Sequence, residues 1–354
     1  MRRAVLLGVA IAAVAGSAAS AGGRAAGPAP LLAVVRSGTP PACGLGGPLG
    51  SQPPVAVIHP PVVNCPPPVQ CATTAPKSGR APACPKPRVD AIYLVAADGR
   101  DPRRFAAGVE PAWSPDGAEL AYVTDDGRFL AVEGVGGTPP MDTIAALPNA
   151  LARTGRIGDP SWSPDGSDIV FTVYETNDSI TGGEWRQQLY TVDLAQRNVR
   201  QLTETATDES DESPAFSPDG SEIAYAHWGT QRGIWLVRPD GSDAHPIAAT
   251  GGYAAGVSWS PDGRAIAFAQ LGFAGDSGIY VVDADGSDLH RVAVTGDLYI
   301  LDRPTWSPDG QEIEFTAADA SAGTRALYAV RADGSDEHVV LREPWPVYQP
   351  AWQP

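Results

Sequence analysis

Large apolar residues alternate with small or polar ones in short runs from about residue 90 to the C-terminus. Residues 265–269 (Ala-Ile-Ala-Phe-Ala) show the two-residue period of a strand with one buried face. A second kind of run combines an aliphatic residue, an aromatic or aliphatic residue and a valine, a composition that favours extended backbone. Six such runs predict six equivalent strands, at residues 92–95, 129–132, 189–192, 234–237, 279–282 and 327–330.

The tetrapeptide Ser-Pro-Asp-Gly punctuates these runs five times, each time directly after an aromatic residue. Proline fixes φ for a turn, aspartate bonds its own backbone and glycine accepts positive φ, so each copy predicts a tight turn between two strands. A period of 43 to 54 residues indicates a propeller or solenoid. The aromatic residues are Trp113, Trp162, Phe216, Trp259 and Trp306, and a decayed sixth copy ends the chain at Trp352.

One repeat contains four predicted strands, which is the content of one propeller blade. We therefore predict an all-β fold over residues 89–354, a six-bladed β-propeller of four-stranded antiparallel blades. The phase of the repeat leaves Trp352 without following strands, so the C-terminal strand must join the N-terminal strands at 91–106 in a shared last blade. This closure would hide the sheet edges. The last blade holds three strands unless residues 55–58 or another linker segment adds one.

The repeated motif (aromatic-Ser-Pro-Asp-Gly, a strand, Tyr-x-Val, then Asp-Gly-Ser) resembles that of the TolB-like β-propeller, the Pro-Asp relative of the WD40 repeat. The resemblance covers roughly residues 89–354. It implies an extracytoplasmic propeller of a kind often used for protein binding, and it supplies no ligand.

The first 88 residues differ from the repeats in composition. Arg2 and Arg3 precede an apolar stretch at 4–16 and a small-residue cleavage site near Ala21, which together predict an export signal over residues 1–21. An uncleaved anchor helix is the alternative. Residues 22–88 are rich in Pro and Gly and predict a linker or collar. Its four cysteines predict two disulfides, with all three connectivities open: Cys43, Cys65, Cys71 and Cys84.

The net charge of −16 argues against partners that are nucleic acids or anionic lipid surfaces. We expect an exported monomer that is periplasmic, extracellular or in the cell envelope, with no transmembrane segment in the mature chain and no cofactor.

Candidate catalytic and metal-binding patterns are weak. His245, His290 and His338 occupy one repeat position on the predicted outermost strands, too far apart to share a metal. The acidic run at 283–288 lacks the glycine at position six and the distal glutamate of an EF-hand calcium loop. Residues 275–278 (Gly-Asp-Ser-Gly) have no accompanying nucleophile elbow or triad context. We therefore predict no catalytic residue and no metal ligand.

The loops between second and third strands, and between consecutive blades, vary in length and chemistry, whereas the other loops are uniform turns. Variable loops on a rigid scaffold usually carry function. Four aromatic residues outside the repeat pattern fall in these loops, and such residues are favoured binding anchors. They are Trp185, Trp228, Trp345 and Tyr348. The alternative is a structural role, in which these side chains pack the loops against the blades.

Charged residues precede the first strand of several blades, where the chain reaches the rim of the central channel. A ring of carboxylates there would suit a cation or a basic peptide, and ordinary solvated charge is the alternative. The rim residues are Glu110, Asp159, Glu212, Asp302 and Arg303.

These observations favour a non-catalytic binding module outside the cytoplasm, engaging a protein, peptide or glycan through its variable face. Two alternatives stay open: a metal-dependent hydrolase or lyase with its site at the channel mouth, and a purely structural cell-envelope protein.

Overall fold

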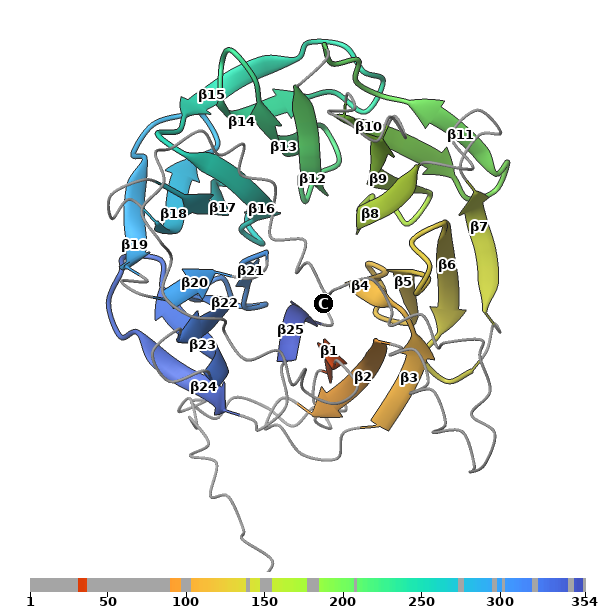
Figure 1. Ribbon diagram of the computed structural model, residues 1–354, viewed down its shortest axis with the longest axis horizontal. Coiled ribbons are helices and arrows are strands. Elements are labelled where there is room, and N and C mark those ends of the chain that lie inside the picture. The colour runs from red at the N-terminus through yellow and green to blue at the C-terminus, as the bar shows by residue number, and fades with distance from the viewer. Residues whose placement is uncertain are drawn as a thin grey trace, which may run out of the picture.

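The chain folds as an all-β propeller of four-stranded antiparallel blades arranged in a ring (Figure 1). This computed structural model describes residues 31–36, 90–96, 103–137, 141–146, 155–176, 185–206, 209–272, 277–294, 298–300, 303–319, 324–342 and 347–352. Within these ranges no helix is long and apolar enough to cross a membrane.

Most blades follow the chain order, with the first strand nearest the axis of the ring. One blade contains β4 (Val109–Trp113), β5 (Glu119–Val123), β6 (Phe129–Gly134) and β7 (Asp142–Ala146). Another contains β16 (Tyr253–Trp259), β17 (Ala265–Leu271), β18 (Gly278–Asp283) and β19 (His290–Val294). In a third, β20 (Leu298–Ile300) and β21 (Thr305–Trp306) both pair with β22 (Glu312–Asp319), followed by β23 (Thr324–Arg331) and β24 (His338–Arg342).

An eight-stranded sheet holds two further runs of strands. The first is β8 (Arg156–Trp162), β9 (Asp168–Thr176), β10 (Trp185–Asp193) and β11 (Asn198–Gln201). The second is β12 (Ser210–Phe216), β13 (Ile223–Trp228), β14 (Gly233–Val237) and β15 (His245–Ala249). Each run is antiparallel, and a single parallel pairing of Gln187 with Ser210 joins them.

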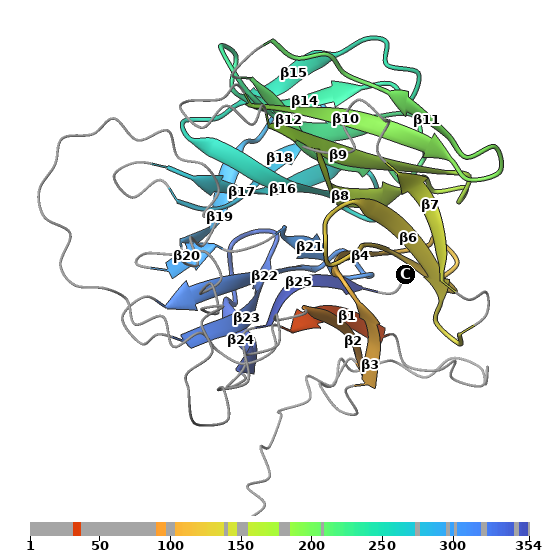
Figure 2. The ribbon, with the colours of Figure 1, turned by 45° about the vertical axis from the view of Figure 1, so that its right-hand side comes forward.

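The blade that contains both ends of the described chain has the order β25-β1-β2-β3 (Figure 2). It comprises β25 (Val347–Trp352), β1 (Leu31–Arg36), β2 (Ala91–Ala96) and β3 (Arg103–Ala107). Strand β1 lies between β25 and β2, where Ala33 pairs with Ala351 on one side and with Leu94 on the other. The Ala33 side chain is fully buried. Trp352 therefore does lie in the first strand of a shared blade, as the repeat phase predicts.

Residues 31–36, which lie within the predicted linker, supply the second strand of the closing blade. The last blade therefore gains a fourth strand from a linker segment, the case that the sequence leaves open. The alternative donor of that strand, residues 55–58, lies outside the described residues.

The tryptophans of the first strands join neighbouring blades. In three of them the indole N–H donates to a main-chain carbonyl of the preceding blade, and these residues are at most 9 % exposed. The bonds run from Trp162 to Ala112 at 3.1 Å, from Trp259 to Ala215 at 3.1 Å and from Trp306 to Ser258 at 3.2 Å. The repeated aromatic residue therefore adds one blade-to-blade hydrogen bond to the apolar packing.

Each Ser-Pro-Asp-Gly turn is a closed set of hydrogen bonds. In the turn at 217–220, the Ser217 hydroxyl donates to Asp219 at 2.7 Å and accepts the N–H of Glu222 at 3.0 Å. Asp219 also accepts the N–H of Ser221, and Gly220 has φ of 73°. The same serine–aspartate bond recurs at 114–116, 163–165, 260–262 and 307–309. The end of the blades that carries the Ser-Pro-Asp-Gly turns is thus stabilised by the same local hydrogen bonds in each repeat.

Candidate functional site

A bulge interrupts the first strand of several blades, on the side away from the Ser-Pro-Asp-Gly turns. The strand register shifts there, and the bulged residues Glu110, Asp159, Ser213 and Gly256 have φ of 54°, 51°, 53° and 66°. Positive φ is uncommon for residues other than glycine, and bulges often re-aim side chains beside functional sites. In the third of these strands the residue equivalent to Glu110 and Asp159 is therefore Ser213. Glu212 comes one residue earlier, before the bulge.

Asp159 is the centre of a polar network at this end. Its N–H donates to Glu110 at 2.5 Å, and its Oδ2 accepts the Tyr174 hydroxyl at 2.9 Å and the Thr172 hydroxyl at 3.3 Å. A guanidinium nitrogen of Arg303 lies 3.7 Å from Asp159 Oδ1, and both side chains are partly buried. The structure therefore brings together three of the predicted rim residues: Glu110, Asp159 and Arg303.

Glu212 joins the same region as a buried carboxyl group. Its residue is only 4 % exposed, and the Tyr253 hydroxyl hydrogen-bonds to it. Burial raises the pKa of Glu212 to about 8, and the neighbouring charges of Asp159 and Asp211 act in the same direction. Glu212 is therefore largely protonated at neutral pH. Burial also raises the pKa of Tyr174, so this hydroxyl remains a proton donor in its bond to Asp159.

The first strands surround the axis of the ring (Figure 1). Residues of these strands line a cavity of about 330 Å³. Arg303 lines this cavity near the polar network, and the prolines of the Ser-Pro-Asp-Gly turns line it at the other end. We call the Arg303 end, with Glu110, Asp159 and Glu212, the channel mouth.

Buried polar atoms without a protein hydrogen-bond partner gather near β12. Among the described residues, five buried side-chain atoms lack such a partner. Unpaired buried polar groups are rare and costly, so they mark places where water or a ligand completes the bonding. The atoms are Gln187 Oε1, Thr205 Oγ1, Ser210 Oγ, Glu212 Oε1 and Arg303 Nη2.

The aromatic residues predicted as loop anchors have varied positions. Trp185 begins β10 and Trp228 ends β13, so both lie at strand ends and not in loops. Trp228 packs on Tyr253 with ring centroids 5.6 Å apart, and the Arg232 guanidinium lies 4.2 Å from its ring centroid. Tyr348 lies in β25 opposite Val35.

Other predicted site residues fall outside the described part of the chain. They are Trp345, Asp302 and the four cysteines, together with the predicted export signal over residues 1–21.

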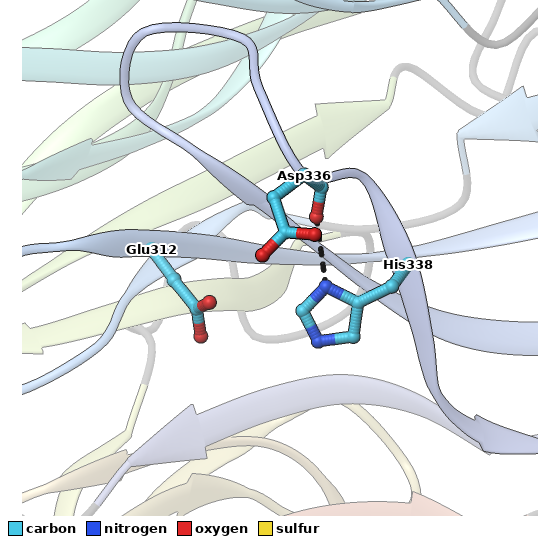
Figure 3. Close-up of side chains that lie close together, drawn as sticks. All are labelled: Glu312, Asp336 and His338. Atoms are coloured by element: carbon cyan, nitrogen blue, oxygen red, sulfur yellow. Dashed lines mark hydrogen bonds between the residues drawn. The ribbon is translucent and has the colours of Figure 1, made fainter. Parts of the chain in front are cut away.

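One group of side chains has metal-like spacing. The ligand atoms of Glu312, Asp336 and His338 lie within 4.8 Å of one another (Figure 3). His338 Nδ1 lies 2.8 Å from the carbonyl oxygen of Asp336. His245 and His290 make the same contact in their own turns, where the preceding aspartates also have positive φ. This recurrence explains the contact of His338 with Asp336 as part of a turn that three blades share.

Sequence reasoning missed Thr172 and Tyr174, which supply two of the hydroxyl donors to Asp159. Both side chains point to the same face of β9 because they are two residues apart. The sequence does contain a signal for them: the predicted second strand continues beyond Phe171 with several polar residues.

Comparison with known proteins agrees with this architecture. The family described as the TolB beta propeller domain matches residues 109–354, more than half of the chain. Among curated proteins, none matches the sequence.

Solved structures with the same fold include TolB from Acinetobacter baumannii, at 22% identity and a TM-score of 0.61 over 75% of this chain and 63% of that one. The chain thus spans less than two thirds of that TolB. An oligogalacturonate lyase in complex with manganese is 20% identical, with a TM-score of 0.53 over 72% and 71% of the two chains. An oligogalacturonate lyase from Vibrio parahaemolyticus is 18% identical, with a TM-score of 0.53 over 72% of each chain. At these identities the likenesses show a shared fold.

Proposed function

Because this chain belongs to the TolB beta-propeller family, we propose that it is an exported, non-catalytic binding propeller whose partner docks at the channel mouth. The partner is an extracytoplasmic protein, peptide or glycan. Family resemblance supports a protein or peptide, since such propellers often bind proteins.

The single observation that carries this proposal is the polar mouth around β12. Glu212 and Arg303 each keep a buried atom without a hydrogen-bond partner in the described part of the chain. Carboxylates of Glu110 and Asp159 lie beside them. A fold that leaves buried polar atoms unpaired loses stability, so such atoms are typical of surfaces that a ligand completes.

Several expectations belong to the same proposal. Counting the two antiparallel runs of the eight-stranded sheet as separate blades gives six blades. Residues 1–21 act as the export signal, and two disulfides staple the Cys-rich segment of a monomer in the periplasm or cell envelope. Trp185, Trp345 and Tyr348 add aromatic contacts, and Asp302 adds charge beside Arg303.

Partner capture from envelope extract tests the proposal. The mouth variant Glu110→Gln/Asp159→Asn and the turn variant Asp219→Asn/Asp262→Asn remove the same number of charges from opposite ends of the blades. We expect partners, identified by quantitative mass spectrometry, to be lost with the mouth variant and kept with the turn variant. A Trp185→Ala/Trp345→Ala variant tests the aromatic contribution. Partners kept by the mouth variant and lost with the turn variant would overturn the assignment.

One observation favours a second candidate, a hydrolase or lyase at the channel mouth. Glu212 is a buried carboxyl group whose pKa is raised to about 8, a value suited to proton transfer near neutral pH. Cleavage of acidic oligosaccharides, followed by absorbance of the unsaturated product, tests for lyase activity. Turnover by the wild type that disappears in Glu212→Gln would favour this candidate over the binding module.

A further inference from the structure

Strand β12 carries two buried acids on opposite faces. Glu212 faces Tyr253, whereas its neighbour Asp211 points to the other side because strand side chains alternate. Asp211 is paired with His227 of β13 across the sheet, and its Oδ1 lies 2.7 Å from His227 Nδ1. The two side chains are only 5 % and 12 % exposed, so this contact fixes the orientation of the imidazole.

Asp211 and His227 line a pocket of about 570 Å³ that is separate from the axial cavity. Its walls come from the connection between β11 and β12, from strands β12 to β14 and from the connection between β13 and β14. Gly229 lies beside two of the lining residues, His227 and Glu209. A Cβ placed on Gly229 would stand 2.7 Å from His227 Nε2 and 2.8 Å from Glu209 Oε1, too close for either contact.

The chemistry of the pocket is acidic and aromatic. Glu204, Glu209 and Asp211 line it, while none of its described lining residues is Lys or Arg. Arg200 lies near Gly241 at the edge, where its guanidinium donates to the carbonyls of Pro239 and Asp240. The pocket therefore gathers three carboxylates, and its walls answer two of them with single polar contacts: His227 lies against Asp211, and the Thr230 N–H donates to Glu209 at 3.4 Å.

Aromatic rings form one wall of the same pocket. The Trp235 ring centroid lies 5.0 Å from that of His227 and 6.4 Å from that of Tyr225. Aromatic faces attract cations, and the attraction adds to that of nearby carboxylates. A volume of this size also exceeds what one metal ion needs and suits a side chain.

Thr205 provides an independent sign of a ligand. This residue lines the pocket and is only 6 % exposed, yet its hydroxyl oxygen has no hydrogen-bond partner among the described residues. A hydroxyl can accept a hydrogen bond from an ammonium or guanidinium N–H.

We propose that this pocket binds an organic cation, namely the guanidinium or ammonium group of a basic side chain in a partner peptide. Glu209 and Asp211 supply the charge, Trp235 and Tyr225 supply the aromatic wall, and Thr205 accepts one hydrogen bond. The site does not depend on the function proposed for the channel mouth, because Glu212 and Arg303 lie outside the pocket lining.

Calorimetric titration with blocked tetrapeptides tests the site. The peptides contain one arginine, one lysine or one citrulline, the last being a neutral counterpart of arginine. We expect the arginine peptide to bind at least about tenfold more tightly than the citrulline peptide, because the loss of charge removes the attraction to two carboxylates. Comparison of the arginine and lysine peptides shows which cation the pocket prefers. Equal binding of the arginine and citrulline peptides, or no binding of either cation, would overturn the proposal.

Variants locate the binding in this pocket. Glu209→Gln and Asp211→Asn should each weaken arginine-peptide binding about tenfold, and Gly229→Ala should weaken it by crowding His227 and Glu209. Glu222→Gln, which removes a partly exposed carboxylate at the end of a Ser-Pro-Asp-Gly turn, is the control and should leave affinity unchanged. Should Asp211→Asn fail to fold, Glu209→Gln decides the question. Unchanged affinity in Glu209→Gln and Gly229→Ala would refute the site, as would tight binding of manganese or zinc alone that excludes the peptide.

Discussion

The two ends of the blades satisfy their polar groups in different ways. At the turn end, serine and aspartate of each Ser-Pro-Asp-Gly copy bond to each other and to the turn backbone, as Ser217 and Asp219 do. At the channel mouth, polar side chains come from separate blades, and Glu212 and Arg303 keep buried atoms that no described residue bonds. The comparison teaches that the repeated end closes its own hydrogen bonds, whereas the irregular end keeps unbonded buried atoms, which is why we propose that a partner docks there.

The same two ends respond to pH in opposite directions. Hydrogen bonds lower the pKa of the turn aspartates, and the backbone N–H and hydroxyl of Ser167 with the Ser163 hydroxyl lower that of Asp165 to about 2. The ionised turn aspartates therefore stabilise the folded chain fully above pH 3.8, and this stabilisation is lost as the pH falls toward about 2. The raised pKa of Glu212 means that the folded chain holds this proton more tightly than the unfolded chain. Its effect is a loss of stability as the pH rises from 4.5 toward about 8.

The largest effect is expected where the ring closes, since both ends of the blades require a closed scaffold. Ala33→Asp places a charge at a fully buried position of β1, between β25 and β2. We expect a loss of about 4 kcal/mol or more in the free energy of unfolding, measured by urea denaturation. Met141→Asp, at a residue 55% exposed, is the control and should change stability little. Equal stability of both variants would show that residues 31–36 do not form this strand.

Glu212→Gln should remove the alkaline loss of stability. At pH 5 the variant and the wild type should unfold alike, because Glu212 is protonated in the folded chain. At pH 9 the variant should be more stable by on the order of 2–4 kcal/mol, since each unit of pKa difference corresponds to about 1.4 kcal/mol. Denaturation at a series of pH values measures the difference. A difference between the two proteins that does not change with pH would contradict the assignment of the raised pKa to Glu212.

Ser217→Ala tests the turn end. The substitution removes a bond to Asp219 and leaves the Glu222 N–H without its acceptor, at a position that is 4 % exposed. We expect a loss of about 2 kcal/mol in unfolding free energy, with no effect on partner capture. Ser221→Ala removes an exposed hydroxyl from the same aspartate and should cost less. If capture fell with Ser217→Ala while stability held, the turn end would have a binding role.

Trp259→Phe has the smallest expected effect. It removes the indole bond to Ala215 of the preceding blade and keeps most of the ring volume. We expect a loss of about 1 kcal/mol, followed by thermal or urea unfolding. Phe216, which already occupies this repeat position, shows that a phenyl ring fits there. An unchanged unfolding free energy would mean that the indole bonds contribute nothing to blade joining.

The sequence predicts the turn end well because its bonds are local. Ser217 to Glu222 contains all the partners of one turn, and the motif repeats. The closing strand is harder to predict, because Leu31–Arg36 is a short apolar run in a Pro-rich region and its partners lie at 91–96 and 347–352.

The channel mouth is predicted only in part. The sequence predicts Glu110, Asp159 and Arg303 just before the first strands, and the structure brings them together. Glu110 and Asp159, however, lie within β4 and β8 as bulged residues. The sequence assigns the rim position of β12 to Glu212, but the structure gives it to Ser213, because the bulge starts there. The residue types alone do not show at which residue a strand bulges. The contact between Asp211 and His227 depends on strand register, which sets the pairs across β12 and β13.

The most direct test removes one negative charge from each end and compares the signs of the results. Unfolding free energy at pH 8.5, together with partner capture, would be measured for Glu212→Gln and Asp219→Asn. The account predicts that Glu212→Gln is more stable than the wild type and captures less partner, whereas Asp219→Asn is less stable and captures the same amount. Loss of stability in Glu212→Gln with full capture, or loss of capture in Asp219→Asn, would contradict the division between a stabilising end and a binding end.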